Sequence, residues 1–214
     1  MRTAQRLRLL YDRMRERFGP QHWWPAETPF EVMVGAILTQ NTNWKNVERA
    51  ITNLRDAGVL SPAGLSGLPV GLLAEYIRPA GYYNIKAGRL RNLLEWIDNE
   101  YGGDPAAALA QPLSTLRAQL LAIRGIGPET ADSILLYAAG LPIFVVDAYT
   151  CRILSRHQLL DEPFDYHRVQ ELFMDNLESD PQLYNEYHAL LVRIGKTYCK
   201  KSKPNCADCP LLGL

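Results

Sequence analysis

Two glycines that flank one isoleucine, Gly125-Ile126-Gly127, form the segment with the clearest chemical use, and helical patterns lie on both sides of it. Glycine adopts backbone angles that a side chain forbids, so N–H groups beside the start of the second helix can approach a phosphate closely. Such contacts bind a nucleic-acid backbone without reading its sequence. The alternative is that Gly125 ends one helix and Pro128 begins the next. The glycines by themselves do not decide between these interpretations.

An aspartate downstream favours the first interpretation. The apolar connector from Gly140 to Val146 delivers Asp147 to the start of the next helix, where an aspartate commonly serves only as an N-cap. A hairpin, a Gly/Pro loop and then this aspartate together resemble the helix-hairpin-helix glycosylases of the endonuclease III superfamily, and the resemblance extends from about Thr28 to the end of the chain. It implies an enzyme of base excision repair that removes a damaged base from DNA.

The resemblance also implies roles for individual residues. In that superfamily the residue matching Asp147 is the catalytic carboxylate, because breaking an N-glycosidic bond builds positive charge on the sugar, which a fixed carboxylate stabilises. The target base is flipped out of the duplex, and a side chain fills the gap. The matching residue for that role is Gln40, and Tyr82 matches the position of a wedge residue. The hairpin residues expected to contact the DNA backbone are Gly125, Ile126 and Gly127.

Glu129 departs from the pattern of glycosylases that also cut the DNA strand. Those enzymes present a lysine at this point, whose amine forms a Schiff base with the sugar. A carboxylate cannot form an imine, so we expect a monofunctional enzyme that uses water and lacks AP lyase activity. Glu129 would be a second catalytic residue that adds a favourable charge near a cationic base or helps to place water. The alternative is a glutamate at a helix start that interacts favourably with the helix dipole.

The segment Gly127–Asp132 looks like the 3-methyladenine DNA glycosylase III (MagIII) branch of the superfamily, and so do the surroundings of Trp23, Trp24 and Trp44. This resemblance implies alkylated purines such as 3-methyladenine as the excised bases, stacked between Trp44 and one of the two adjacent tryptophans. Methylation at N3 makes adenine cationic, and cations stack favourably on tryptophan faces. The alternative is that Trp23 or Trp24 anchors the core.

Three cysteines near the end of the chain, Cys199, Cys206 and Cys209, follow the spacing C-x6-C-x2-C. They resemble the first three ligands of the superfamily's [4Fe-4S] cluster loop, which uses four thiolates. The fourth would follow one position beyond Leu214 and is absent from this sequence. Zinc is the inorganic alternative, because C-x2-C is also a zinc spacing, although no histidine lies near enough to complete a familiar pattern. We expect Cys151 to be a small buried residue.

The elements that position these residues are predicted to be helices. Apolar residues recur at spacings of three and four without sustained alternation of period two, so the fold is expected to be all-α. Thr28 can cap the helix that follows it, with Glu31 closing a capping box, and that helix is apolar on nearly every side and therefore central. Two helical lobes are expected, with the active site in the cleft between them. One spans residues 28–140, with the helix-hairpin-helix at about 115–139. The other combines residues 1–27 with 141–214, including the cysteine loop 199–214.

The charge balance requires any contact with DNA to be local. The 23 basic and 23 acidic residues give a formal net charge of zero. A local basic cluster near the cysteines comprises Lys196, Lys200, Lys201 and Lys203. No apolar stretch has the length of a membrane span, and the N-terminus lacks the apolar core of a signal peptide. These features favour a cytoplasmic, nucleoid-associated protein of a bacterium or archaeon, acting as a monomer on double-stranded DNA.

Two other functions stay open. The same scaffold could excise oxidised pyrimidines or mismatched bases, as endonuclease III-like glycosylases do. A function of another class is a helix-hairpin-helix module that binds DNA without catalysis. The released base separates the first pair of possibilities, whereas an Asp147→Asn variant separates an enzyme from a binder, which would be indifferent to the change.

Overall fold

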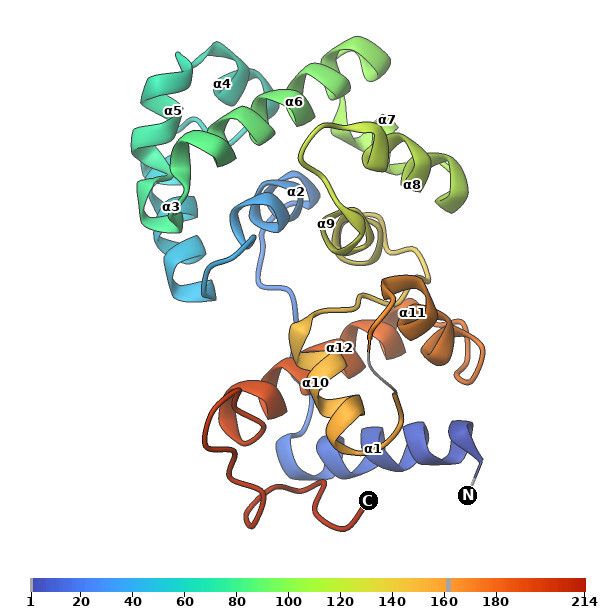
Figure 1. Ribbon diagram of the computed structural model, residues 1–214. Coiled ribbons are helices and arrows are strands. Elements are labelled where there is room, and N and C mark those ends of the chain that lie inside the picture. Colours follow the sequence, from blue (N-terminus) through green and yellow to red (C-terminus); the bar gives the residue numbers. More distant parts are fainter. Residues whose placement is uncertain (1, 161–162) are drawn as a thin grey trace. The chain divides into compact units, whose positions relative to one another are not determined.

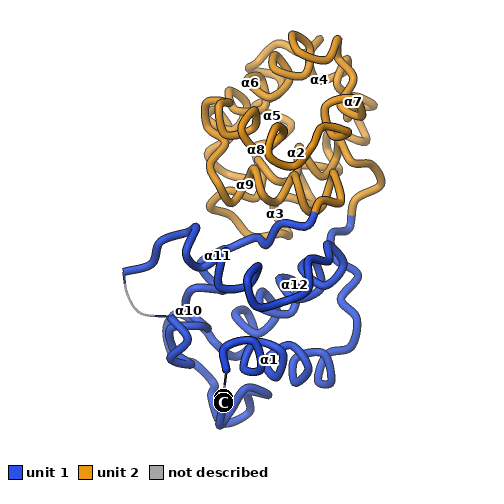
Figure 2. The backbone as a smooth tube through the Cα atoms, turned by 90° about the vertical axis from the view of Figure 1, so that its right-hand side faces the viewer, with its two compact units in different colours: residues 1–25, 142–214 blue, residues 26–141 orange. Residues whose placement is uncertain are grey.

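The computed structural model describes residues 2–160 and 163–214, and the chain divides into two compact units (Figure 2). Unit 2 comprises residues 26–141, and unit 1 comprises residues 1–25 and 142–214. Every regular element in the described ranges is a helix, which confirms the all-α prediction (Figure 1). None of these helices is long and apolar enough to cross a membrane. We propose that the units are the two expected lobes.

Unit 2 holds the longer run of helices. In chain order they are α2 (Pro29–Leu38), α3 (Trp44–Asp56), α4 (Pro62–Gly67), α5 (Val70–Tyr76), the 3-10 turn η1 (Arg78–Ala80), α6 (Tyr83–Tyr101), α7 (Pro105–Leu109), α8 (Leu113–Ala122), α9 (Pro128–Ser133) and the π-helical turn η2 (Ile134–Ala138). Because η2 follows α9 without a break, residues 128–138 form one continuous helical segment, which is the second helix of the hairpin.

The helix α2 is the centre of unit 2, as its composition predicts. Residues 30–38 are all buried, and α3, α6, α9 and η2 pack against the helix. Thr28 Oγ1 accepts a hydrogen bond from the Glu31 N–H (3.1 Å), which confirms the N-cap. The predicted capping box is wrong, because the Glu31 carboxylate does not return to Thr28. It is only 6% exposed, and a buried carboxylate needs a cation, which Arg55 of α3 supplies at 2.9 Å.

Unit 1 is built from α1 (Thr3–Phe18), α10 (Ala148–Arg156), α11 (Tyr166–Met174) and α12 (Pro181–Thr197), with α12 packed against α1 and α10. Its core is aromatic. The rings of Phe144 and Phe173 stack with centroids 3.8 Å apart, and Tyr187 meets both rings edge-on. Tyr187 Oη donates to the Leu7 carbonyl (2.8 Å). The two sequence segments of unit 1 therefore share one core.

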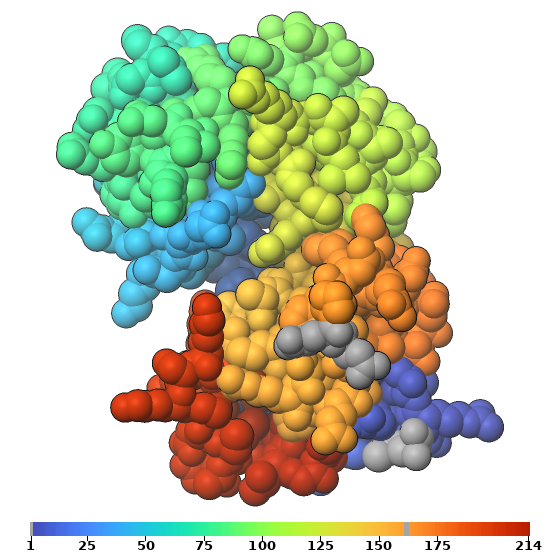
Figure 3. Space-filling model, viewed as in Figure 1, coloured from blue at the N-terminus to red at the C-terminus, as the bar shows by residue number. Residues whose placement is uncertain are grey.

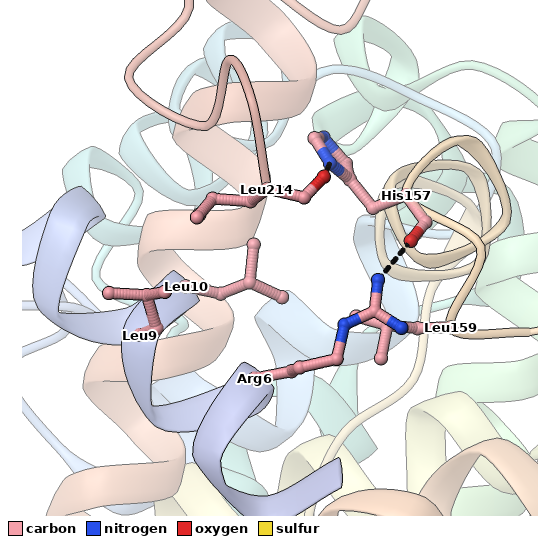
Figure 4. A pocket seen from close by; sticks show the side chains of 6 residues that line it. All are labelled: Arg6, Leu9, Leu10, His157, Leu159 and Leu214. Atoms are coloured by element: carbon pink, nitrogen blue, oxygen red, sulfur yellow. Dashed lines mark hydrogen bonds between the residues drawn. The ribbon is translucent and has the colours of Figure 1, made fainter. Parts of the chain in front are cut away.

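The helix α1 also binds the end of α10. Arg6 Nη2 donates to the His157 carbonyl (2.6 Å), and His157 Nδ1 lies 3.1 Å from the Leu214 carbonyl oxygen (Figure 4). A small cavity of about 20 Å³ lies beside this contact. It is lined by Arg6, Leu9, Leu10, His157, Leu159 and Leu214. The helix that begins with Asp147 as its N-cap is thus fixed at its far end as well.

Candidate active site

The hairpin joins α8 to α9 through a turn fixed by glycine geometry. Gly125 has a φ of +96°, a left-handed value that favours glycine. The Ile126 side chain is 5% exposed and belongs to the core, whereas Gly127 is exposed at the N-cap of α9. Arg117 Nε of α8 donates to Asp132 Oδ1 of α9 (2.8 Å), and this buried carboxylate ties the two helices together. The predicted contacts of the turn with DNA stay a prediction.

One cavity in unit 2, of about 170 Å³, brings Gln40 and Glu129 together. Its lining residues are Ala36, Thr39, Gln40, Asn41, Arg89, Glu129, Thr130 and Ser133. Gln40 Nε2 donates to the Gly125 carbonyl (3.2 Å) and to Thr130 Oγ1 (2.8 Å), so the loop after α2 is bonded to the hairpin. Glu129 is exposed. No lysine is among the described residues that line this cavity.

The connector that precedes Asp147 is buried and held in place by α11. Residues 143–146 are all at most 3% exposed. Gln170 Nε2 donates to the Phe144 carbonyl (2.7 Å), and the N–H of residue 146 donates to Tyr166 Oη (3.4 Å). These bonds satisfy backbone groups that burial removes from water. They also fix the point at which the chain presents Asp147.

The helix α10 is pressed against α12 at a glycine. The Tyr149 ring lies so close to Gly195 that a Cβ there would be 2.2 Å from Tyr149 Cδ1. Arg152 stacks over the same ring, 5.0 Å from its centroid, and its Nε donates to the Cys199 carbonyl (2.7 Å). The close approach fixes α10 against α12.

The Asp147 carboxylate has a partner for each oxygen. Its Oδ1 accepts from the Thr150 N–H (2.7 Å) and from Thr150 Oγ1 (2.9 Å), so Asp147 does cap α10. Its Oδ2 lies 3.6 Å from His188 Nε2 of α12. Burial acts to raise the pKa of Asp147, but His188 and the two Thr150 bonds outweigh burial and hold the pKa below the usual value. The carboxylate is therefore ionised at neutral pH.

The three tryptophans are half-buried and belong to different units. In unit 1 the rings of Trp23 and Trp24 meet edge-on, with centroids 6.0 Å apart, and Lys196 Nζ lies 5.8 Å from the Trp23 centroid. In unit 2, Trp44 begins α3 and its Nε1 donates to Glu48 Oε1 (2.8 Å). Half-burial leaves part of each indole at the surface, as a pocket wall requires. Their role as such walls stays a prediction.

Tyr82 protrudes from unit 2 immediately before α6. It is 68% exposed and adopts a left-handed φ of +47°, which is uncommon for a residue with a side chain. One helical turn later Ile85 is 56% exposed, so the two residues place apolar surface in solvent at the start of one helix. An exposed aromatic ring is what a wedge needs, and the wedge role is a proposal on that ground.

Residues 34–179 match the HhH-GPD superfamily, described as base excision DNA repair proteins. The chain belongs to this superfamily. The matched range includes the hairpin and Asp147 and ends before the cysteine loop. The family assignment made from the hairpin and the downstream aspartate is confirmed, and the chain is a base excision repair DNA glycosylase.

Individual relatives of this HhH-GPD glycosylase agree with the assignment. A protein of Methanocaldococcus jannaschii that is named as a DNA repair glycosylase is 48% identical over 203 residues, covering 94% of this chain and 92% of the relative. Endonuclease III of Sulfolobus acidocaldarius is 30% identical over 181 residues, covering 84% and 78%. The crystal structure of H. pylori 3-methyladenine DNA glycosylase (MagIII) bound to 1,N6-ethenoadenine superposes with a TM-score of 0.79 at 29% identity, covering 92% and 98%.

The cysteine loop of the glycosylase lines a third cavity. Cys199, Cys206 and Cys209 line a space of about 210 Å³ in unit 1, and the C-terminal segment that carries them forms part of the visible surface (Figure 3, red). Burial and then the neighbouring sulfurs raise the pKa of the Cys209 thiol. Arg156 Nη1 donates to Cys199 Sγ (3.2 Å). Among the described residues no group of three or more His, Cys, Asp or Glu side chains has the geometry to hold a single metal ion. Cys151, expected to be buried, is half-buried in α10.

Sequence reasoning missed His188 and Arg89. His188 lies within the apolar stripe of α12, and a polar residue at such a position was the signal available in the sequence; in the structure it is 6% exposed. Arg89 gave no signal, because its contact with Gln40 joins residues 49 positions apart and depends on how α6 packs against the loop after α2.

Proposed function

We propose that this glycosylase is monofunctional and hydrolyses the N-glycosidic bond of alkylated purines such as 3-methyladenine in double-stranded DNA, acting as a monomer. The observation that carries the proposal is the state of Asp147. Its side chain is 11% exposed, and its pKa lies below the usual value, so a charged carboxylate is available at the start of α10. Such a group can stabilise the positive charge that develops on the sugar and can orient water.

In the proposed reaction, water adds to C1′ of the sugar as the bond to the base breaks. The base leaves with the bonding electron pair, and the attacking water gives up one proton to the solvent. A base alkylated at N3 is already cationic, so it departs as a neutral molecule and needs little help from a general acid. Gln40 fills the gap that the flipped nucleotide leaves, Tyr82 acts as the wedge, and the backbone of the hairpin turn, residues 125–127, binds phosphate.

Glu129 and the state of Lys86 support hydrolysis without lyase activity. A lyase needs an uncharged amine beside the sugar. Glu129 presents a carboxylate to the cavity that it shares with Gln40, and we propose that it places water or stabilises the cationic base. Lys86 has a pKa lowered by burial to about 8, yet it is 1% exposed and its Nζ donates to the carbonyls of Leu38 and Ala80. Its amine is therefore occupied inside unit 2.

The tryptophans and the similarity to MagIII support alkylated purines as the substrate class. Lys196 already lies over the Trp23 ring, so we assign Trp23 a structural role rather than contact with the base. We propose Trp24 and Trp44 as the walls that stack the base, because a cationic purine gains cation–π stabilisation from each indole face. The solved relative with 29% identity is a 3-methyladenine DNA glycosylase in complex with a modified adenine.

The test is release of free base from duplexes that contain 3-methyladenine, an oxidised pyrimidine or a mismatch. We expect release from the alkylated duplex, no release by Asp147→Asn, and a strong loss with Glu129→Gln. Asparagine caps helices as well as aspartate, so Asp147→Asn should remain folded. Release from only the oxidised or mismatched duplex would replace alkylpurine specificity with an endonuclease III-like one. A covalent adduct trapped by borohydride would overturn the monofunctional assignment.

We further propose that Cys199, Cys206 and Cys209 hold a [4Fe-4S] cluster as three of its four thiolate ligands. The three cysteines are among the residues that line a cavity of about 210 Å³, and among the described residues they do not form a site for a single metal ion. A multi-atom cluster suits this arrangement better than one zinc ion. When bound, the cluster would order the lysine-bearing loop, and it takes no part in breaking the glycosidic bond. Visible absorption and iron content of freshly purified protein test this proposal. Zinc without iron would contradict it.

A further inference from the structure

One face of α6 contacts three loops of unit 2 through residues spaced by three. Lys86 Nζ donates to the carbonyls of Leu38 and Ala80 (both 2.8 Å), which are the last residues of α2 and η1. One turn later, Arg89 Nη1 donates to Gln40 Oε1. After a further turn, Asn92 Nδ2 donates to the carbonyl of residue 124 in the hairpin (2.8 Å). The loops that carry Gln40, Tyr82 and the hairpin turn are therefore held by a single helix.

Arg89 is the member of this set that contacts both Gln40 and the hairpin. Its stem runs along Gly125, where an added Cβ would lie 2.5 Å from Arg89 Cγ. Gly125 is thus needed twice, for its positive φ and for the close approach of Arg89. The turn could not keep this packing with any other residue in place of glycine.

The Gln40 amide is bonded at both ends. Its oxygen accepts from Arg89, while its nitrogen donates to the Gly125 carbonyl and to Thr130 Oγ1. An amide with bonds to both groups has one orientation and one rotamer, because rotation by half a turn would set donors against donors. A charged donor also makes the strongest of these bonds. Gln40 and the hairpin therefore move as one body.

We propose that Arg89 is a positioning residue, which holds Gln40 in register with the hairpin turn so that both engage DNA together. This inference rests on the proposed role of Gln40 as the residue that fills the gap. Without Arg89, the Gln40 oxygen loses its partner and only the two bonds from its nitrogen remain. The amide is then held less firmly, and DNA binding must order it again. Ordering one or two such side chains weakens binding about tenfold.

A double-mutant cycle on DNA binding tests the proposal independently of the excised base. The duplex carries a tetrahydrofuran abasic analogue opposite 2-aminopurine, whose fluorescence reports what fills the gap. We expect Arg89→Ala to raise Kd about tenfold and to shift the fluorescence toward that of Gln40→Ala. In the Gln40→Ala background, Arg89→Ala should change Kd less than about twofold. Arg91→Ala, on the same helix but bonded to the Ser66 carbonyl, is the matched control and should bind like wild type.

Two results would overturn the proposal. If the factors by which Arg89→Ala and Gln40→Ala each raise Kd simply multiply in the double variant, Arg89 acts independently of Gln40. If the slope of log Kd against log salt concentration falls by about 1 in Arg89→Ala, Arg89 contacts a phosphate directly. If Arg89→Ala does not fold, Arg89→Lys takes its place in the cycle, since it keeps the charge and stem but not the planar fork. Failure of base release with an intact cycle would count against the proposed substrate and not against Arg89.

Discussion

Replacing His188 with leucine should destabilise the protein and disturb the charge of Asp147. His188 Nε2 and Asp147 Oδ2 are 3.6 Å apart, and the side chains are 8% and 11% exposed. His188 is the side chain that faces Asp147 Oδ2. Removing one partner of a buried pair leaves the other uncompensated and costs about 3–5 kcal/mol. We expect His188→Leu to lower the free energy of unfolding by about 3 kcal/mol.

The same substitution should move the acid limb of the pH–rate profile upward. Burial remains in His188→Leu while the favourable interaction with His188 is lost, so the pKa of Asp147 rises. A protonated carboxyl cannot stabilise a cationic sugar, and activity should fall at a higher pH than in wild type. In wild type the folded pKa lies below the unfolded value, so the stability that Asp147 contributes is present above the unfolded value and lost as pH falls through the folded one.

Single-turnover release of 3-methyladenine from mildly acidic to mildly alkaline pH measures this shift, and urea unfolding measures the stability. His188→Gln, which keeps a donor without the charge, should recover part of the rate. His167→Leu on α11 is the matched control, because His167 is exposed. A folded His188→Leu protein with the wild-type acid limb would refute the reasoning, since it would show that His188 does not set the ionisation of Asp147.

Three further predictions follow from other contacts. Burial first and the charge of Arg89 second lower the pKa of Lys86 from 10.5 to about 8. Between these pH values the unfolded chain keeps the proton on Lys86 and the folded chain does not. From pH 8 to 10.5 the unfolding free energy of wild type should therefore rise by about 3 kcal/mol more than that of Lys86→Met. The same change of unfolding free energy with pH in both proteins, measured by urea titrations, would contradict this. Gly195→Ala would put a Cβ 2.2 Å from the Tyr149 ring and should lower the free energy of unfolding by about 1–3 kcal/mol. Calorimetry would then show a Tm lowered by roughly 2–12 °C. An unchanged Tm would mean that the ring moves aside without cost. Cys209→Ser should lose the bound iron, measured as iron per chain, and iron retained at the wild-type level would remove Cys209 from the ligand set.

The sequence predicts the local features of the site better than the long-range ones. Thr28 and the apolar residues after it predict α2 and its central place, because capping and burial depend on neighbouring residues. The fate of Glu31 could not be predicted in the same way. Its partner Arg55 is 24 residues away, and only the packing of α3 on α2 brings the two charges together.

The candidate site shows the same division. Asp147 and Glu129 stand out because each follows a recognisable connector or turn. The family assignment followed from the hairpin and Asp147. Thr150, three residues after Asp147, holds one of its oxygens, but the partner of the other oxygen is His188, 41 positions away on α12. The left-handed backbone of Tyr82 was also unexpected, since a residue with a Cβ rarely adopts it and no local pattern announces it.

The interleaved arrangement of the two units gives the chain an order of events during synthesis. Unit 2 is one continuous segment and can close its core as soon as residue 141 has left the ribosome. The helix α1 is made before unit 2 but finds its partner late, because Tyr187, which bonds to the Leu7 carbonyl, is 180 residues downstream. At 5–20 residues per second, α1 waits roughly 10–40 s with its buried residues Leu7, Leu10 and Met14 still uncovered. Its apolar face is therefore a surface that a chaperone could cover until α12 has been made.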